Sequence, residues 1–540
     1  MERIRGVLAE LNIMDLLRAA SIVGTLAGLV ASLYLILRGE YLPAILIASF
    51  SIAPTAVIAY ARRRKGLFTK TGVDLALVTA ITHMYCLSMG NVGPEGLVKA
   101  IAGNKEYGVY SKVFKRILQL AMGLGYGFTR AIGLVARTVR PPLRDILIRL
   151  SEAMASRAPE EHLALEMTTL AEEYSGEYER MVESMKVIGG IYASVISISA
   201  LAVMVSSLLT IFLENNLIPV LVYMAAIVVL AMMSIALKIS TPDERLVYIG
   251  ESPPRLYSLF RLSLLSALGS LAFPIVIVMG RGYEGIPYML ISAGGIVLMP
   301  GLLAYRLESY VSSLDRFYPT FIKALGENLS STTDFRSALS YVLHMELGPL
   351  KEHAQRALSR IKAGVRVEKA LRLMASEVAS YQVHMLNSIF VEAFRVGSRP
   401  LDVGKILSSL AIKVLELRNK RKVVTKSFEI VLVILQPIVV ALLVILTTLA
   451  AFFSQTITQL PYFEWGSIPV PIVKYGVMGV IIAIAVLNSL SINLVRGGFR
   501  GTSLLYAGIL LLESGIAWIG ASKLMDTLLG QFASGIELPF

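Results

Sequence analysis

Residues that could catalyse a reaction or hold a metal occur singly in this 540-residue sequence. The sequence contains no P-loop of the form GxxxxGKS or GxxxxGKT, no HExxH zinc motif and no GxSxG nucleophile motif. The five histidines are scattered, and the single cysteine, Cys86, can form neither an intramolecular disulfide nor a cysteine-rich metal site. We therefore predict no enzymatic activity, no cofactor and no metal.

Glu513 is the one clear ionisable residue inside a predicted membrane-spanning segment, in the sequence LLLESGIAW. An ionisable side chain in the bilayer is costly and marks either a packing role or a transport role. We interpret Glu513 as structural, pairing within a helix bundle or at an irregular helix. Proton or ion handling is the alternative.

Basic residues form the strongest charge feature, in the second of two polar segments. We predict that nine of them bind an acidic partner on the cytoplasmic side, with an ordinary solvated helix face as the alternative: Lys351, Arg356, Arg360, Lys362, Arg366, Lys369, Arg372, Lys413 and Arg418. Four more run directly into an apolar segment that begins at Phe428, so we expect them at the level of anionic lipid headgroups: Lys420, Arg421, Lys422 and Lys426.

The composition identifies the elements that must position these residues. The chain is 55% hydrophobic and 16% charged, with a mean hydropathy of +0.67, which is typical of a polytopic membrane protein. The net charge of +13 is explained by lysine and arginine retained on the cytoplasmic side of a membrane, and we expect no nucleic-acid partner.

Apolar runs of about 20 residues predict nine membrane-spanning helices: 16–37, 41–61, 187–213, 217–237, 262–279, 286–304, 428–453, 471–491 and 503–521. Because Arg62 to Lys65 follow the first pair, the N-terminus should be cytoplasmic, and nine spans then leave the C-terminus outside. The expected cell-membrane protein is all-α, with these units: hairpin 1–65, helical domain 66–186, hairpin 187–238, cytoplasmic linker 239–261, hairpin 262–304, helical domain 305–427, hairpin 428–493, and last span with outer tail 494–540.

The two polar segments look like copies of one domain. Gly364 to Leu371 has the same pattern of glycine, basic residue and Ala-Leu or Ala-Ile as Gly125 to Ile132. Val391-Glu-Ala-Phe394 likewise corresponds to Ser151-Glu-Ala-Met154. Both matches are separated by about 240 residues, far more than the period of a solenoid repeat. We predict an internal duplication that places both helical domains in the cytoplasm.

The second domain resembles the platform proteins of type II secretion and type IV pilus machines. The resemblance lies in four successive segments: Asp315 to Leu325, Ser337 to Leu339, Gly364 to Leu371 and Glu392 to Gly397. The nine-span count and the extra spans before each domain are most similar to the archaeal branch of the family, which includes the platform of the archaellum.

This resemblance implies a non-enzymatic membrane protein that binds a hexameric cytoplasmic ATPase. It also implies that pilin- or archaellin-like subunits pass from the bilayer into a growing filament, and we expect a homo-oligomer, as a dimer. A secondary transporter with duplicated halves is the alternative. Transporter repeats usually carry polar groups at mid-membrane, whereas the polarity of this sequence is concentrated in its two polar segments.

Overall fold

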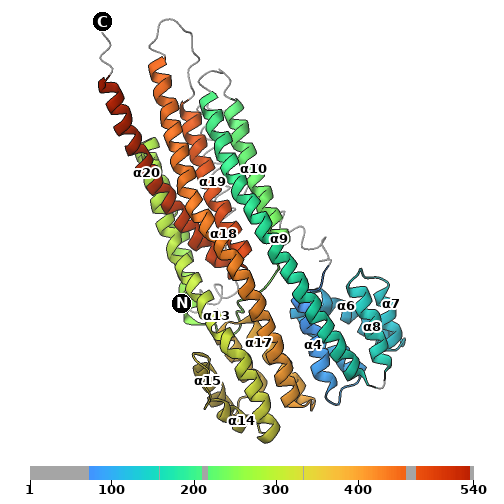
Figure 1. Ribbon diagram of the computed structural model, residues 1–540. Helices are drawn as coiled ribbons and strands as arrows, with labels where there is room; N and C mark the ends of the chain where they lie inside the picture. The colour runs from blue at the N-terminus through green and yellow to red at the C-terminus, as the bar shows by residue number, and fades with distance from the viewer. Residues whose placement is uncertain (1–71, 157, 210–216, 333, 458–469, 536–540) are drawn as a thin grey trace.

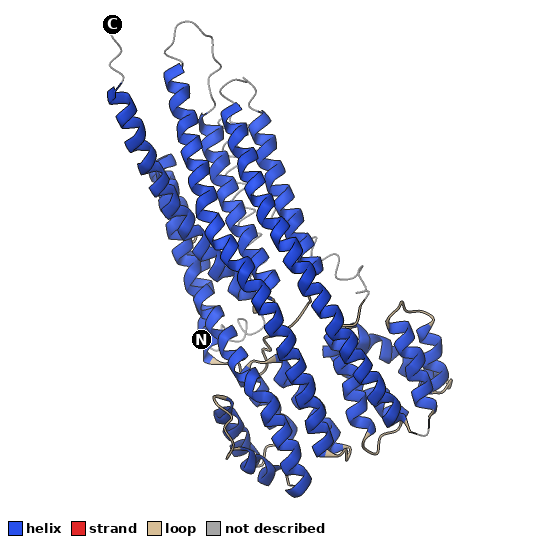
Figure 2. Ribbon diagram, viewed as in Figure 1, coloured by secondary structure: helices blue, strands red, loops and turns tan. Residues whose placement is uncertain are grey.

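The computed structural model describes residues 72–535, except for 157, 210–216, 333 and 458–469. Helices make up the regular structure of these residues, and Val247 and Ser380 form one isolated antiparallel bridge (Figure 2). The predicted all-α class is confirmed. The first predicted hairpin, with spans 16–37 and 41–61, lies outside the described residues.

Six helical stretches of the described residues are long and apolar enough to cross a membrane. One of them, Arg255–Thr332, comprises three helices in succession, α11 (Arg255–Ser270), α12 (Ala272–Arg281) and α13 (Ile286–Thr332), with the short η4 (Gly282–Gly285) before α13. The other five are α9 (Pro159–Leu209), α10 (Leu217–Ser240), α18 (Pro400–Ile457), α19 (Val470–Arg496) and α20 (Ser503–Gly535), the last entered through η5 (Arg500–Thr502). The chain is thus a membrane protein, while a total of nine spans stays a prediction.

Two helical lobes lie at the same end of the apolar bundle (Figure 1). The first lobe (residues 72–186) contains the start of α9 together with α4 (Leu75–Ser88), α5 (Pro94–Gly103), η2 (Lys105–Tyr107), α6 (Val109–Leu118), the π-helical η3 (Gln119–Gly123), α7 (Phe128–Ala136) and α8 (Leu143–Ala155). The second lobe (residues 305–427) contains the end of α13, the start of α18 and, between them, α14 (Phe335–Val342), α15 (Leu350–Lys362), α16 (Val367–Val378) and α17 (Tyr381–Arg395).

Three helices run without a break from a lobe into the apolar bundle. The predicted boundaries at 186/187, 304/305 and 427/428 fall inside α9, α13 and α18 respectively. Hydropathy marks where a helix enters lipid, and a helix has no physical reason to end there because its backbone hydrogen bonds are internal. The lobes are therefore joined to the membrane part by continuous helix.

In the second lobe the sequence predicts a helix N-cap at Thr333-Asp334, a helix end at Gly364 and a turn from Gly397 to Pro400. Asp334 caps α14 by accepting a hydrogen bond from the backbone N–H of Ser337 at 2.9 Å. Gly364 has φ +86° directly after α15, and Gly397 has φ +84° after α17, so both adopt the left-handed conformation that ends a helix. Pro400 is the first residue of α18. These predicted helix ends are confirmed.

The buried apolar residues form two main clusters. One extends through both lobes and includes Phe114 and Tyr178 of the first lobe with Tyr318 and Phe390 of the second. The other lies within the membrane bundle, around Tyr192 and its neighbours on α10, α18 and α19. Because the two lobes share one hydrophobic cluster, they form a joint unit of packing.

Helices α13 and α20 approach each other closely through glycine. A Cβ added to Gly301 would lie 2.3 Å from the backbone nitrogen of Leu505, and one added to Gly294 would lie 2.8 Å from that of Leu512. Small residues permit such backbone contact between membrane helices, where lipid already satisfies apolar side chains. The pair therefore depends on these glycines for its spacing.

Candidate partner-binding surfaces and the polar contacts beneath them

Seven of the nine predicted partner-binding residues are exposed, and five of these seven have no ion-pair partner within the described part of the chain. Lys351 and Lys362 belong to α15, Arg366 and Lys369 lie at the start of α16, and Lys413 lies on α18. Their charge is available to another molecule.

Arg356 and Arg360 converge on a buried carboxylate, Glu377. Arg360 forms an ion pair with Glu377, and Arg356 Nη1 lies 3.8 Å from its Oε2. His353 Nδ1 lies 3.6 Å from the same oxygen, and burial lowers the pKa of this histidine, which favours its neutral form. The charges of the two arginines are therefore partly balanced inside the second lobe.

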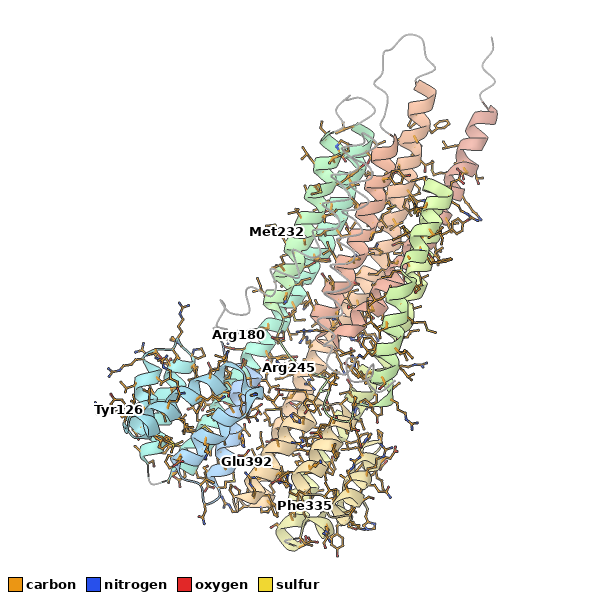
Figure 3. The ribbon with its side chains drawn as sticks, turned by 180° about the vertical axis from the view of Figure 1, so that it is seen from behind. Tyr126, Arg180, Met232, Arg245, Phe335 and Glu392 are labelled. Carbon is orange, nitrogen blue, oxygen red and sulfur yellow. The ribbon has the colours of Figure 1, made fainter. Side chains whose placement is uncertain are left out.

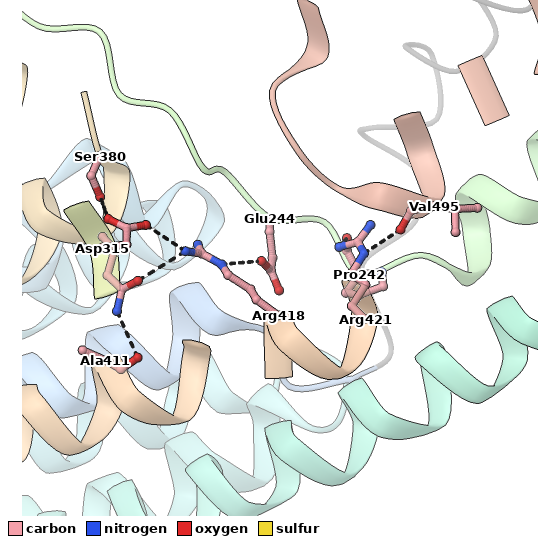
Figure 4. Close-up of polar contacts among 9 residues, drawn as sticks. Pro242, Glu244, Asp315, Ser380, Ala411, Arg418, Arg421 and Val495 are labelled. Carbon is pink, nitrogen blue, oxygen red and sulfur yellow. Dashed lines mark hydrogen bonds and ion pairs between the residues drawn. The ribbon is translucent and has the colours of Figure 1, made fainter. Parts of the chain in front are cut away.

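Arg418 is positioned differently from the prediction. Its side chain is 11% exposed, and its Nε donates to Glu244 Oε2 at 2.9 Å (Figure 4). Its Nη1 donates to Asp315 Oδ2 at 3.2 Å and to Gln382 Oε1 at 3.3 Å, while the Ser380 hydroxyl donates to Asp315. The guanidinium is largely buried and paired with two carboxylates of the same chain, so Arg418 is removed from the set of partner-binding residues.

Arg421 also requires a correction, because it was expected at lipid headgroups. It is 3% exposed, and its guanidinium donates to the backbone carbonyl oxygens of Val495 at 2.8 Å and Pro242 at 3.1 Å (Figure 4). It also donates to the carbonyl oxygen of Leu494 at 2.8 Å. These are the last carbonyls of α19 and one carbonyl of the segment after α10. A cation at a helix C-terminus is favourable, so Arg421 fixes the end of α19.

The other three residues expected at headgroups are exposed on α18. Lys420 forms an ion pair with Glu179 of α9. Lys422 and Lys426 have no ion-pair partner within the residues that the structure describes. For these two, contact with lipid headgroups stays a prediction.

Polar contacts join the two lobes directly. The Nδ1 of His83 on α4 shares a hydrogen bond with the Tyr107 hydroxyl at 3.0 Å. Its Nε2 lies 3.3 Å from Glu392 of α17, and Glu392 lies between the two lobes (Figure 3). Arg399 forms an ion pair with Glu160 at the start of α9. The N-terminal part of α9 thus supplies two carboxylates, Glu160 and Glu179, to basic residues of the second lobe.

The segment between α10 and α11, which we call the linker strap (residues 241–254), is held along the second lobe. Tyr248 N donates to Ala379 O at 2.8 Å, and Tyr381 N donates to Leu246 O at 3.0 Å. The ring of Tyr248 stacks on His384, with centroids 3.7 Å apart. The predicted linker 239–261 is therefore shorter and carries defined contacts.

The linker strap also reaches the first lobe. Arg245 lies 3.3 Å from Glu106 of η2, and Glu251 lies 3.2 Å from Arg372 of α16. With Glu244 on Arg418, the strap contacts both lobes and the base of α18. Sequence reasoning assigned Arg372 to a partner; in the structure its charge is paired with the strap, although its side chain is half exposed.

A chain of buried polar side chains crosses the interior of the membrane bundle. The Tyr192 hydroxyl donates to Asn488 Oδ1 at 3.0 Å, Asn488 Nδ2 donates to Gln436 Oε1 at 2.9 Å, and Gln436 Nε2 donates to Ser514 Oγ at 3.1 Å. These residues come from α9, α19, α18 and α20 in turn. Sequence reasoning considered only ionisable groups and missed them. One oxygen of the neighbouring Glu513 is buried without a hydrogen-bond partner among the described residues, so a structural pairing for it stays a prediction.

The structure thus defines a helical membrane protein with two lobes at one end of a single bundle. Among the described residues there is no group of three or more histidines, cysteines and acids that could hold a metal.

Comparison with known proteins identifies relatives over most of the chain. It is 24% identical over 486 residues to flagella accessory protein J of Methanocaldococcus jannaschii, covering 83% of this chain and 84% of that protein. It is 23% identical over 494 residues to flagella accessory protein J of Methanococcus voltae, covering 85% and 87%. No family model and no solved structure matches the chain. These relatives confirm the resemblance to the archaellum platform protein of the archaeal branch.

Proposed function

We propose that the chain is the cell-membrane platform of an archaellum-type filament machine, a non-enzymatic core that binds a hexameric cytoplasmic ATPase and supports the assembly of pilin- or archaellin-like subunits. The observation that carries this proposal is the placement of both lobes at one end of the bundle, each continuous with membrane helices (Figure 1). The relatives named flagella accessory protein J support the filament to which we assign it.

The sequence contains no P-loop, so a separate protein has to hydrolyse nucleotide. Such a partner would act on the lobes, because they are the water-facing part of the molecule. Subunits with an apolar helix could leave the bilayer along the bundle without that helix entering water. The predicted orientation, with a cytoplasmic N-terminus and an outer C-terminus, places the lobes beside the ATPase.

Helix order supports the proposed duplication. In the first lobe α5, α6 and α9 begin at residues 94, 109 and 159, and in the second α14, α15 and α18 begin at 335, 350 and 400. Corresponding helices therefore follow one another at nearly constant separation. On this basis the α6–α7 turn of the first lobe and the α15–α16 turn of the second are equivalent positions, as the match of Gly125 with Gly364 predicts.

The most accessible basic site of the second lobe is the α15–α16 turn. Lys362, Arg366 and Lys369 are exposed around it and have no ion-pair partner within the described ranges. Exposed charges chiefly accelerate association and set its salt dependence. We propose that this turn attracts an acidic surface of the ATPase, and that Lys351 and Lys413 add to the positive electrostatic potential of the second lobe. We also propose that the chain forms a homodimer. Lys422 and Lys426 are proposed to contact lipid headgroups.

A binding measurement tests the proposal with the full chain in lipid nanodiscs and the purified archaellum ATPase from the same organism. The triple variant Lys362→Glu, Arg366→Glu, Lys369→Glu should associate about tenfold more slowly at low salt. The charge-conserving variant Lys362→Arg, Arg366→Lys, Lys369→Arg is the matched control and should bind as wild type does. Absence of any ATPase binding to wild type would refute the proposed function, and equal binding of both variants would refute the role of this turn.

A further inference from the structure

The turn between α6 and α7, which we call the first-lobe tip (residues 119–127), exposes large apolar side chains to water. Leu124 is 65% exposed, Met122 is 56% exposed and Tyr126 is 41% exposed. The tip begins with the π-helical η3 and ends at the glycine before α7. Single exposed apolar residues are ordinary, whereas three in one short turn are typical of a binding site.

The backbone of the first-lobe tip accounts for this exposure. Gly125 has φ +69° and Gly127 has φ +73°, a conformation that other residues rarely adopt. A Cβ at either glycine would meet nothing within 4 Å, so glycine is needed there for the backbone conformation and not for space. The two glycines hold Leu124 and Tyr126 in a turn away from the buried core of the lobe.

Basic residues flank the tip. Lys115 and Arg116 lie in the last turn of α6 and Arg130 lies in the first turn of α7, and four more cations lie farther from the tip in the same lobe: Lys112, Arg137, Arg140 and Arg144. All seven are exposed and have no ion-pair partner within the part of the chain that the structure describes. The guanidinium of Arg130 lies over the ring of Tyr126, 5.2 Å from its centroid. Sequence reasoning placed the free basic charge in the second lobe, where several arginines are in fact balanced by internal acids.

The position of the tip excludes two of the surfaces that could cover it. Tyr126 lies at the outer end of the first lobe, away from the membrane helices, so a lipid surface does not reach it (Figure 3). A two-fold contact with a second copy would place these cations against themselves, which is unfavourable. An acidic protein surface is complementary in charge, and an apolar cleft within it would remove the three exposed side chains from water.

We propose that the first-lobe tip is a docking site for an acidic protein surface with an apolar cleft that receives Leu124 and Tyr126. This inference rests on the proposed function, in which that surface belongs to the motor ATPase. The equivalent α15–α16 turn of the second lobe offers charge alone. The two turns therefore differ in role: the second lobe attracts the partner by charge, and the first lobe anchors it by apolar burial.

Binding of the same ATPase to the full chain in nanodiscs tests this inference. The double variant Leu124→Ser, Tyr126→Ser should bind about thirtyfold more weakly, mainly through faster dissociation, because apolar anchors dominate interface energetics. The matched control is Leu165→Ser, since Leu165 is 69% exposed on α9 of the same lobe and lies outside the tip. It should bind as wild type does, and the thermal unfolding of both variants should match wild type.

A second variant separates charge from apolar contact. Lys115→Glu with Arg116→Glu should slow association at low salt, and the difference from wild type should shrink as salt rises. If wild type binds the ATPase and the Leu124, Tyr126 double variant binds equally well, the inference is overturned while the proposed function stands. A tip variant that dissociates a dimer of the chain but leaves ATPase binding unchanged would also overturn it, by assigning the tip to a contact between copies.

Discussion

Replacing Arg418 of α18 with methionine should weaken the attachment of the linker strap to that helix. In the folded chain Arg418 bridges Glu244 of the strap and Asp315 of α13, at 2.9 and 3.2 Å. The side chains of the two carboxylates are 5% and 1% exposed. Methionine has a similar apolar length but no charge, so the variant leaves two buried acids facing each other without a cation.

The magnitude follows from the burial of these groups. Removing one partner of a buried ion pair costs about 3–5 kcal/mol, because the remaining charge stays desolvated. Burial already raises the pKa of Asp315, and Arg418 opposes that rise, so the variant should raise this pKa further. A carboxyl with a raised folded-state pKa destabilises the fold at high pH and recovers when it is protonated. The loss should therefore be smaller at about pH 5 than at about pH 8.

Hydrogen exchange at the strap measures the effect where it occurs. The amides of Tyr248 and Tyr381 donate to the backbone across the strap contact, so they exchange only when the strap opens. A loss of about 3–5 kcal/mol should speed their exchange about 150- to 5,000-fold, after correction for the intrinsic rate at each pH. The control is Lys413→Met, an exposed site on the same helix that should leave exchange unchanged.

The reasoning would be refuted by wild-type exchange in Arg418→Met at about pH 8. A further check is the triple variant with Asp315→Asn and Glu244→Gln, which removes the uncompensated charge and should recover most of the protection. If ATPase binding fell in Arg418→Met while strap exchange did not change, Arg418 would belong to a partner surface after all.

Three further outcomes are expected from thermal unfolding in detergent. Gly294→Ala should cost about 1–3 kcal/mol because its Cβ meets the α20 backbone, whereas Gly295→Ala, with open space around it, should be neutral or slightly stabilising. Asn488→Leu breaks two hydrogen bonds between membrane helices and should cost about 1–2 kcal/mol. Burial lowers the pKa of His353 and His384 below 6.5, so the unfolded chain takes up protons first as pH falls, and the second lobe should lose stability below about pH 6.5.

Local sequence signals predicted the helix ends well. Asp334, Gly397 and Pro400 act through their own backbone and nearest neighbours, so their effect is visible in a few residues of sequence. The same holds for the all-α class, which follows from apolar runs of membrane length and from polar segments with helical spacing.

The roles of Arg418 and Arg421 could not be predicted from their own helix. Their partners, Glu244, Asp315 and Val495, come from three other segments of the chain. The sequence predicted a protein partner for Arg418 and headgroup contact for Arg421, and only the fold shows that both side chains turn inward. The exposed residues Lys422 and Lys426 still fit the sequence pattern.

The hydrogen-bonded polar side chains inside the membrane bundle could have been recognised in part from the sequence. Gln436 and Asn488 are amides within long apolar runs, and such residues commonly join membrane helices by hydrogen bonds. Their pairing could not be predicted, because it depends on which faces of α18 and α19 meet. The first-lobe tip was likewise visible as a glycine-rich turn, but the exposure of Leu124 and Tyr126 is a property of the folded lobe.

The unbroken course of α9 gives the molecule a lever. Its 51 residues make a rod of about 75 Å, with one arm in the first lobe and the other across the bilayer. Its only proline is the first residue, so no proline interrupts the rod, and the adjacent Gly189 and Gly190 are the positions at which it would bend most readily. Tilting it by about 5° about its lower end would shift the far end by about 6 Å, roughly the pitch of one helical turn. A small displacement of the first-lobe part of α9 would thus produce a larger displacement of its other end, at the opposite surface of the membrane.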